Sequence, residues 1–289
     1  MILLDGKKTS ADIKEEISLE VRELKSRGHK TPHLAAVIVG HNGASITYVN
    51  AKVKACERVG FESSLIRLPE ETSEEDLLNE IAILNIDNDI DGFIVQLPLP
   101  KHINEQKVIM AIDPKKDVDG FHPENAGLLS IGRPRFVPCT PKGIMFMLQH
   151  FDVDLNGKHV VVVGRSNIVG RPVSVLSSLK SLGNATVTLC HSGTSDLKYF
   201  TQQADVVVAA MGSPEFLDAS FIKEGACLVD VGINRIERDG KSVIVGDVNQ
   251  SSVMGKASSL TPVPKGVGPM TIAMLVENTI VSAELLLIN

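Results

Sequence analysis

The chain has 289 residues, of which 43% are hydrophobic, and a formal net charge of −6. This length exceeds what one hydrophobic core usually serves, so we expect two domains, each with a core of its own. An acidic chain without a long basic run lacks the clustered Lys and Arg that nucleic-acid phosphates require. We therefore expect small molecules as ligands and no nucleic-acid partner.

The cysteines and the N-terminus indicate the compartment. The four cysteines show neither CxxC spacing nor pairing with histidines, which favours reduced thiols over a disulfide scaffold or a zinc site; we expect no metal. The N-terminus becomes polar after Leu4, far short of a signal peptide, and no apolar run approaches the roughly 20 residues of a membrane helix. We expect a cytoplasmic protein without a membrane partner.

The first half alternates between helical and strand patterns. Helices are predicted at 10–27, 45–59 and 73–84, and strands at 34–39, 63–68 and 92–97. The run 34–39 is almost continuously aliphatic, which is typical of a parallel strand covered on both faces. Its C-terminal end, at Gly40, is therefore a plausible ligand edge, and Ser45 is available to cap the helix that follows.

The second half predicts a Rossmann-like domain. A proline- and charge-rich stretch, 113–127, interrupts the alternation, and 136–143 leads into a connecting helix near the domain boundary. Four apolar strands then follow, in HVVVVG from residue 159, at 186–192, at 204–212 and at 226–232. We predict an α/β fold with a catalytic domain at 1–142, joined by a C-terminal helix at 270–289, and a dinucleotide-binding domain at 143–269.

A glycine turn follows the first strand of that second series. Gly164 and Gly170 enclose the sequence GRSNIVG, and Pro172 lies where a helix can start. A strand, a glycine turn and a helix N-terminus together offer backbone N–H groups to a phosphate. The spacing GxSxxxG is not the usual GxGxxG, so a turn with a purely structural purpose is the alternative interpretation.

The next strand favours NADP over NAD. It ends in Cys190-His191-Ser192, where an NAD site would place an acidic residue for the ribose hydroxyls. Arg165 and Ser192 can instead hold a 2′-phosphate, because guanidinium and hydroxyl donors suit a dianion that a carboxylate would repel. The alternative for Arg165 is a surface salt bridge.

The chemically suggestive residues of the first half lie near the predicted ligand edge. Tyr48 and Lys52 are four positions apart and share one helix face, and Gln96 ends a strand before LPLP. A partly apolar site disfavours the charged form of a lysine, which suits it to proton transfer; an ordinary exposed lysine is the alternative. Asp117 and Asp119 are open to three interpretations: metal ligands, turn formers or carboxylates that bind a cyclic amidine.

Six sequence blocks resemble the methylenetetrahydrofolate dehydrogenase/cyclohydrolase family. They are spread over nearly the whole chain in the family's order: YVNAKVKAC, VQLPLP, DPKKDVDGFHPENAG, PCTPKG, VVGRSNIVGRP and TPVPKGVGPMT. The resemblance implies that methylenetetrahydrofolate binds in a cleft between the domains and gives a hydride to NADP⁺. Water then opens the methenyl product to 10-formyltetrahydrofolate. It also implies a homodimer.

The resemblance also implies roles for particular residues. Lys52 is implied as the main catalytic group, with Tyr48 beside it, Gln96 orienting it and Asp119 gripping the pterin. Around the dinucleotide it implies Gly164, Arg165, Ser166, Ser192 and Ile233, with Thr140 and Pro141 near the junction of cofactor and folate.

One departure from the family pattern is Lys265, which stands where the block usually has its first loop glycine. If that position has a positive φ, lysine strains the turn by roughly a kcal/mol. A solvent-facing lysine and a contact with the substrate's glutamate tail are the two interpretations.

Three other functions compete with the bifunctional enzyme. A dehydrogenase without hydrolase activity and a non-catalytic folate or NADP sensor would not need Lys52, Tyr48 and Gln96 together. A formyltetrahydrofolate synthetase would need a GxxxxGK[ST] loop, which the sequence lacks.

Overall fold

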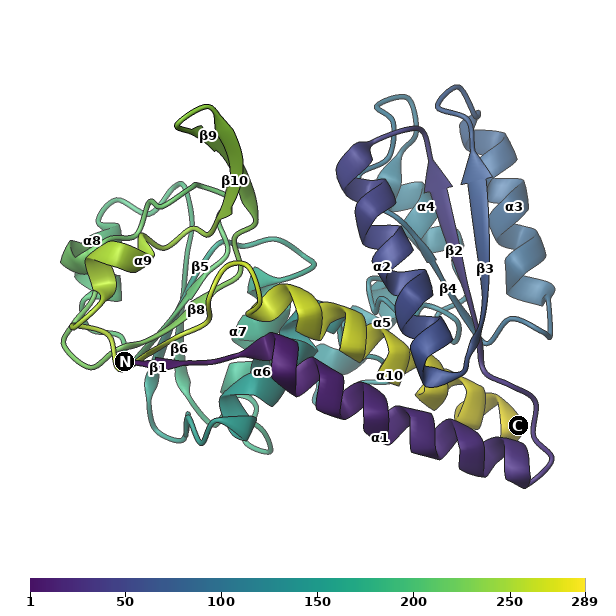
Figure 1. The fold of residues 1–289 in the computed structure, drawn as a ribbon, viewed down its shortest axis with the longest axis horizontal. Helices are drawn as coiled ribbons and strands as arrows, with labels where there is room; N and C mark the ends of the chain where they lie inside the picture. The colour runs from purple at the N-terminus through teal and green to yellow at the C-terminus, as the bar shows by residue number, and fades with distance from the viewer. Residues whose placement is uncertain (289) are drawn as a thin grey trace. The chain divides into compact units, whose positions relative to one another are not determined.

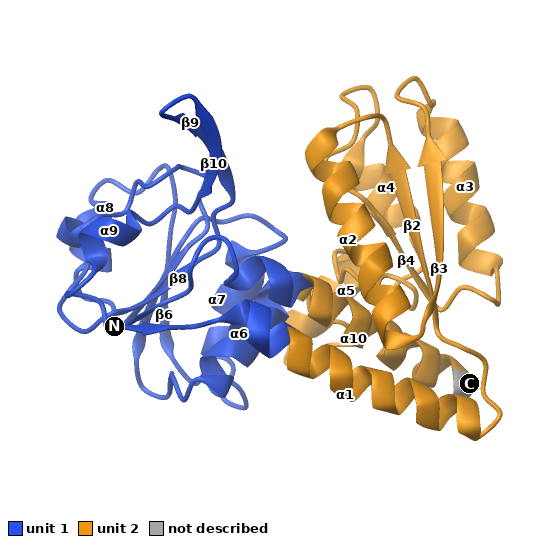
Figure 2. Cartoon of the chain, viewed as in Figure 1, with its two compact units in different colours: residues 1–10, 140–271 blue, residues 11–139, 272–289 orange. Residues whose placement is uncertain are grey.

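The computed structural model describes residues 1–288 and divides into two compact units (Figure 2). Unit 1 contains Met1–Ser10 and Thr140–Thr271, and unit 2 contains Ala11–Cys139 and Ile272–Asn289. The chain passes from one unit to the other within α1 (Gly6–Ser26), at the start of α6 (Cys139–His150) and within α10 (Val267–Ile288). The α/β fold expected from the alternating pattern is confirmed.

Unit 2 is built on a parallel sheet of three strands in the order β3-β2-β4 (Figure 1). The strands are β2 (His33–Val39), β3 (Glu62–Leu68) and β4 (Gly92–Val95). The helices between and after them are α2 (Gly43–Val59), α3 (Glu74–Ile86), α4 (Glu105–Ala111) and α5 (Pro123–Ser130). The central strand β2 is buried from Leu34 onward, as its continuous aliphatic run predicts.

Two helices start differently from the sequence-based expectation, α2 in unit 2 and α1 in unit 1. Asn42, not Ser45, caps α2: its side-chain oxygen accepts hydrogen bonds from the backbone N–H groups of Ala44 and Ser45, and Ser45 itself is buried. α1 begins at Gly6 rather than near Ser10, because the Asp5 carboxylate accepts from the backbone N–H groups of the first turn.

The C-terminal helix α10 is a core helix of the protein. By length and composition its segment Val267–Leu286 could cross a membrane, but 56% of that segment is buried inside the protein. In unit 2, the Asn278 side chain donates hydrogen bonds to the carbonyls of Val118 (2.9 Å) and Val137 (3.0 Å). The polar residue that interrupts the apolar pattern therefore fastens α10 to the loop that carries Asp119.

Unit 1 contains a parallel sheet of six strands in the order β1-β11-β8-β7-β5-β6. The four predicted strands are present as β5 (His159–Val163), β6 (Thr186–Cys190), β7 (Val206–Ala209) and β8 (Cys227–Asp230). The helical segments are α7 (Gly170–Ser178), α8 (Leu197–Thr201), η1 (Ala219–Phe221) and α9 (Gln250–Val253). A separate hairpin, β9 (Asn234–Arg238) and β10 (Lys241–Val245), stands out from the rest of unit 1 in Figure 1.

The first ten residues correct the predicted domain limits. β1 (Ile2–Leu3) pairs with β11 (Ser259–Leu260) at the edge of the large sheet, so Met1–Ser10 belongs to unit 1 and not to the domain predicted at 1–142. A pair of two-residue strands has too little alternation to be recognised from sequence.

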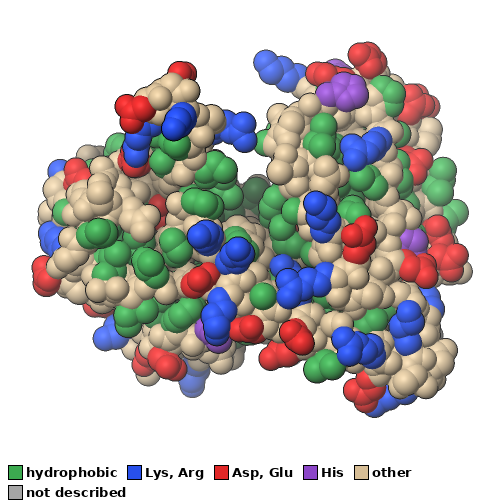
Figure 3. All heavy atoms as spheres, viewed as in Figure 1, with side chains coloured by type: hydrophobic (Ala, Val, Ile, Leu, Met, Phe, Trp, Pro, Cys, Tyr) green, Lys and Arg blue, Asp and Glu red, His purple; other side chains and the backbone are tan. Residues whose placement is uncertain are grey.

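Charged side chains of both signs are interspersed over the face of the molecule shown in Figure 3. Apolar side chains lie between them on both units. This distribution agrees with the near balance of 29 basic and 35 acidic residues in the chain.

Candidate active site

Each parallel sheet has a point where the strand order reverses. In unit 2, β3 and β4 lie on opposite sides of β2; in unit 1, β6 and β7 lie on opposite sides of β5. The connections on the two sides diverge at such a strand, which leaves a crevice at its carboxyl end where open α/β sheets bind ligands. The predicted site residues follow these two strands, Lys52 after β2 and the Gly164 turn after β5.

Lys52 is buried, with only 4% of its surface exposed, although lysine is rarely buried without partners. Its Nζ lies 3.1 Å from Gln96 Oε1 and 4.9 Å from the centre of the Tyr48 ring. The carbonyl accepts a hydrogen bond and the ring face attracts the cation. The structure thus brings together the lysine, tyrosine and glutamine that the sequence placed at one sheet edge.

Gln96 is itself held in place by a local contact. Its Nε2 donates to the Leu97 carbonyl at 2.6 Å, so its Oε1 is the atom left to face Lys52. Lys54, two positions along α2, is exposed. Of the two lysines, only Lys52 is therefore presented to the carboxyl edge of the sheet.

The two aspartates of the DVDG segment have different surroundings. Asp117 is buried and accepts hydrogen bonds from the His122 backbone N–H and the Asn125 amide, both at 2.8 Å, which makes it a turn-forming residue. Asp119 is half-buried, and its Oδ1 accepts a hydrogen bond from the Cys139 thiol at 4.0 Å. Burial raises the pKa of Asp119 above its ordinary value, and the nearby Lys52 charge opposes that shift.

A surface recess of about 350 Å³ lies at the same edge of the unit 2 sheet. The loops after all three strands line it, through Val39 to Asn42, Glu70 and Pro98 to Pro100. Ligand-sized space therefore exists where the three parallel strands end.

The turn after β5 requires glycine at both ends. Gly164 has a φ of 123°, and a Cβ on it would lie 2.0 Å from the Ala210 carbonyl oxygen. A Cβ on Gly170 would lie 1.9 Å from the Gly164 carbonyl oxygen. No side chain fits at either position, because the chain's own backbone packs against both glycines.

The other predicted dinucleotide residues lie around this turn in unit 1. Arg165, Ser166 and Ser192 are exposed, and within residues 1–288 Arg165 forms no ion pair, which removes the salt-bridge alternative. Ser166 Oγ accepts from the N–H groups of Val169 (3.2 Å) and Gly170 (3.3 Å) at the start of α7. Its hydroxyl proton remains free to point outward.

Two further predicted residues have defined surroundings in unit 1. Ile233 follows β8 and is 65% exposed. It lines an apolar pocket of about 270 Å³ with Ile244 and the loop from Pro262 to Pro269. Thr140 Oγ1 lies 2.9 Å from Thr271 Oγ1.

Lys265 adopts the backbone conformation that favours glycine. Its φ is 91°, and the side chain is exposed. A non-glycine residue in the left-handed region lowers the stability of the fold by roughly a kcal/mol. This is the strain expected for a lysine at a position that favours glycine.

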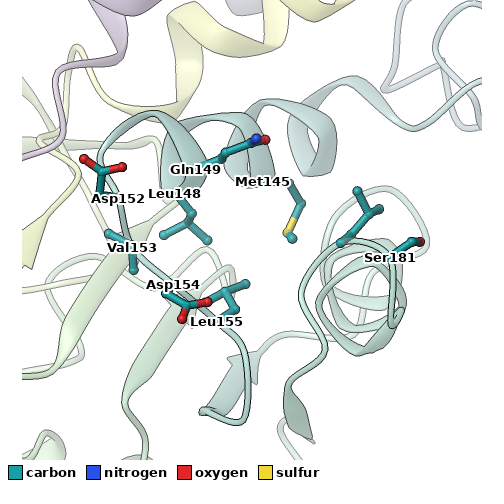
Figure 4. A pocket seen from close by; sticks show the side chains of 9 residues that line it. Met145, Leu148, Gln149, Asp152, Val153, Asp154, Leu155 and Ser181 are labelled. Atoms are coloured by element: carbon teal, nitrogen blue, oxygen red, sulfur yellow. The ribbon is translucent and has the colours of Figure 1, made fainter.

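One hollow of unit 1 contains none of the predicted site residues. It measures about 460 Å³ and lies between the end of α6 and the loop after α7 (Figure 4). Met145 and Leu148 line it on the helix, and Asp152 and Asp154 lie along the following loop. Volume alone therefore does not identify the site, because the glycine turn and the buried lysine lie elsewhere.

Two buried carboxylates behind the unit 1 loops were missed by the sequence analysis, Asp230 and Asp247. Asp230 ends an apolar strand and Asp247 follows a hairpin, so both are at positions where aspartate is common in turns. Within residues 1–288 no three His, Cys, Asp or Glu side chains are grouped closely enough to hold a metal ion.

Two family models match the chain. Residues 4–119 match the catalytic domain of tetrahydrofolate dehydrogenase/cyclohydrolase. Residues 138–286 match the NAD(P)-binding domain of the same family. Together they cover most of the chain, in the order that the six sequence blocks indicated.

Curated proteins and solved structures match along nearly their full length. The chain is 56% identical to "Bifunctional protein FolD" of Flavobacterium johnsoniae, over 99% of this chain and 98% of that protein. It is 49% identical to the crystal structure of the bifunctional FolD enzyme, methylenetetrahydrofolate dehydrogenase/cyclohydrolase, from Campylobacter jejuni, with a TM-score of 0.92 over 98% of this chain and 99% of that one. A Trypanosoma brucei dehydrogenase-cyclohydrolase, solved with NADP and an inhibitor, is 36% identical over 99% and 98% of the two chains, with a TM-score of 0.94.

The raised pKa of Asp119 predicts how its replacement alters stability. Ionising this carboxyl opposes folding once the pH passes the ordinary value near 3.8, so the wild type loses stability as the pH rises through the pKa of the folded state. Asp119→Asn removes that loss, and we expect its Tm to exceed that of the wild type at pH 8. The difference should shrink toward pH 4.

Thermal unfolding followed by circular dichroism at both pH values measures this effect. Asp89→Asn is the matched control, because Asp89 is exposed and should leave the Tm unchanged at either pH. A lower Tm for Asp119→Asn at pH 8 would contradict the assigned burial cost.

Proposed function

Because this chain belongs to the tetrahydrofolate dehydrogenase/cyclohydrolase family, we propose that it oxidises 5,10-methylenetetrahydrofolate with NADP⁺ and hydrolyses the product to 10-formyltetrahydrofolate. The observation that carries this proposal is the buried Lys52 between Gln96 and Tyr48. Both reactions belong to one-carbon metabolism. A sensor that only binds folate or NADP has no need to bury a lysine there.

The proposed chemistry has two balanced steps. In the first, the methylene carbon gives a hydride to NADP⁺ and becomes the methenyl carbon of a cationic amidinium. In the second, water adds to that carbon and loses one proton. The bond from the carbon to one ring nitrogen then breaks, and the hydroxyl proton moves to that nitrogen and leaves the formyl group. The second step needs a group that can accept and return protons beside the substrate.

Lys52 is the group proposed to move these protons and to polarise the folate. Its ammonium is desolvated, so its interactions with substrate are stronger than they would be in water. Gln96 holds it through a neutral carbonyl, which orients the nitrogen without fixing its charge as a carboxylate would. Tyr48 supplies a ring face beside the nitrogen.

Asp119 is proposed to bind the pterin. A pterin presents an N–H and an NH₂ side by side, and a carboxylate accepts both in a bidentate pair. Burial makes the ionised form of Asp119 costly in the free protein, so hydrogen bonds from the pterin would offset a penalty that is already present. Asp117 has no share in this, because it is buried and its Oδ2 already accepts two hydrogen bonds within its own turn.

The glycine turn of unit 1 is proposed to hold the dinucleotide phosphates. The turn lies between the end of β5 and the N-terminus of α7, the arrangement in which backbone N–H groups bind a pyrophosphate. Arg165 and Ser192, both exposed, are proposed to bind a 2′-phosphate, and Ile233 and Thr140 to contact the rest of the cofactor. When bound, the cofactor supplies the hydride acceptor, C4 of its nicotinamide.

A homodimer in the cytoplasm completes the proposal. Its support is the family resemblance, together with the state of the cysteines: within residues 1–288 no disulfide joins Cys56, Cys139, Cys190 or Cys227. Sedimentation equilibrium of the purified chain distinguishes a dimer from a monomer of 31.1 kDa.

The role of Lys52 predicts a specific loss. Lys52→Met keeps the length of the side chain and removes the nitrogen, so we expect methenyltetrahydrofolate hydrolysis to fall by about 100-fold or more. Folate binding should remain measurable, because Asp119 is unchanged. Hydrolysis is followed by absorbance without nucleotide, and binding by titration calorimetry.

Lys54→Met is the matched control, because Lys54 is exposed on the same helix and should keep both activities. Hydrolysis retained by Lys52→Met would refute the role of the lysine. A wild type that neither reduces NADP⁺ with methylenetetrahydrofolate nor hydrolyses the methenyl compound would refute the function.

The role of Arg165 predicts a change in cofactor preference. Arg165→Ala removes a charged donor to the 2′-phosphate, so we expect the ratio of kcat/KM for NADP⁺ to that for NAD⁺ to fall roughly 10- to 100-fold. Arg171→Ala, an exposed arginine in the first turn of α7, is the control. An unchanged ratio in Arg165→Ala would show that another residue selects the phosphate.

A further inference from the structure

Two buried carboxylates in unit 1 have no part in the chemistry proposed so far. Asp230 is the last residue of β8 and is 3% exposed, and Asp247, just after β10, is completely buried. Two carboxylates cost free energy to bury side by side unless many donors compensate them. Both have such donors, and almost all of these are backbone N–H groups.

Asp247 accepts four hydrogen bonds from two separate loops. Its Oδ2 accepts from the backbone N–H groups of Met211 (2.7 Å) and Gly212 (2.9 Å). Its Oδ1 accepts from the Ser213 backbone N–H (2.9 Å) and from Asn234 Nδ2 (2.8 Å). One side chain therefore fastens the loop after β7 to the first residue of β9, which directly follows the loop after β8.

Asp230 holds Asp247 in place. Its Oδ1 accepts from the backbone N–H groups of Asp247 (2.8 Å) and Gly232 (3.0 Å), and its Oδ2 accepts from that of Val248 (3.0 Å). Burial raises the pKa of Asp230 to about 6, against the effect of these donors. At neutral pH the carboxylate is thus available to accept all three.

The packing around the pair is too tight for other side chains. A Cβ on Gly246 would lie 1.8 Å from Asp230 Oδ2, and a Cβ on Gly232 would lie 2.3 Å from Asp247 Oδ1. The two carboxylates therefore pack directly against the two glycines, and no larger residue fits at either glycine position.

The loops fastened by Asp247 border the proposed dinucleotide site. Ile233 lies between Gly232, held by Asp230, and Asn234, held by Asp247, and it remains exposed. The loop after β7 starts at Ala210, whose carbonyl oxygen lies against Gly164 of the glycine turn. Both loops follow strands at the same carboxyl edge of the sheet as that turn.

We propose that Asp247 is a positioning residue for the dinucleotide, which fixes the loop after β7 and the Ile233 loop in the geometry that receives the cofactor. This inference rests on the proposed function of unit 1 and extends it to a residue that does not touch the cofactor. Hydrolysis of the methenyl compound needs no nucleotide, so the inference separates the two activities.

Asp247→Asn tests the inference. The amide keeps one acceptor oxygen but turns an NH₂ group toward N–H donors, so some of the four hydrogen bonds become donor–donor contacts. We expect the Kd and KM for NADP⁺ to rise about tenfold or more, with kcat/KM for hydrolysis within about twofold of the wild type. NADP⁺ binding is measured by calorimetry on the full-length protein, independently of activity.

Asp205→Asn is the matched control. Asp205 lies in the same unit, at the opposite end of β7, and accepts hydrogen bonds from the His159 backbone N–H and from Lys223. We expect it to lower the Tm without raising the Kd for NADP⁺. Asn234→Ala removes only one of the four donors and should raise the Kd about threefold, which keeps the test valid if Asp247→Asn does not fold.

The outcomes separate the inference from the function on which it rests. A wild type without either activity overturns the function. A wild type with both activities and an unchanged Kd for NADP⁺ in Asp247→Asn and Asn234→Ala overturns the inference. Equal loss of binding in Asp205→Asn, or equal loss of both activities in Asp247→Asn, makes Asp247 a merely structural residue and overturns the inference as well.

Discussion

The candidate active site depends on the hydrogen bond between the buried Lys52 Nζ and Gln96 Oε1. A lysine with 4% exposure has lost most of its water, and only a carbonyl oxygen at 3.1 Å, an aromatic ring and the charge of Asp119 replace it. Such an arrangement is costly to stability and useful to chemistry, because a poorly solvated charge acts strongly on a bound substrate. Burial raises the pKa of Asp119. The unit 2 site therefore places a buried lysine near a carboxyl group whose ionisation is opposed by burial.

Both candidate sites lie at the carboxyl end of a strand where the strand order of a parallel sheet reverses. β2 and β5 are the strands at which the order of each sheet reverses, and Lys52 and the Gly164 turn follow these strands. In unit 2 the edge presents the side chains of Lys52 and of Gln96, which follows β4. In unit 1 it presents a turn that requires glycine at Gly164 and Gly170, at the N-terminus of α7. The first arrangement suits proton transfer, and the second suits phosphate binding.

Much of this could be predicted from the sequence, because it rests on local patterns. Aliphatic runs gave the strands, and the four-residue spacing of Tyr48 and Lys52 placed both on one helix face. The pairing of β1 with β11 was missed, since two-residue strands have no periodicity. Asn42 was missed as a cap because Ser45 offered an equally good side chain. Asp230 and Asp247 act through backbone donors far away in sequence, which no motif records. The substrate was predicted from the resemblance of six sequence blocks to a known family. Neither hydrophobic periodicity nor residue spacing could have identified it.

Gln96 is proposed to hold the buried Lys52 in the position in which it acts on the folate. Steady-state hydrolysis of methenyltetrahydrofolate by Gln96→Leu measures this effect. Leucine has a similar volume but cannot accept the hydrogen bond from Nζ. We expect kcat to fall about tenfold or more, because Lys52 loses its orientation. KM should change less than about threefold, because Asp119, the proposed pterin ligand, is unchanged. An unchanged kcat, or a rise in KM alone, would contradict it.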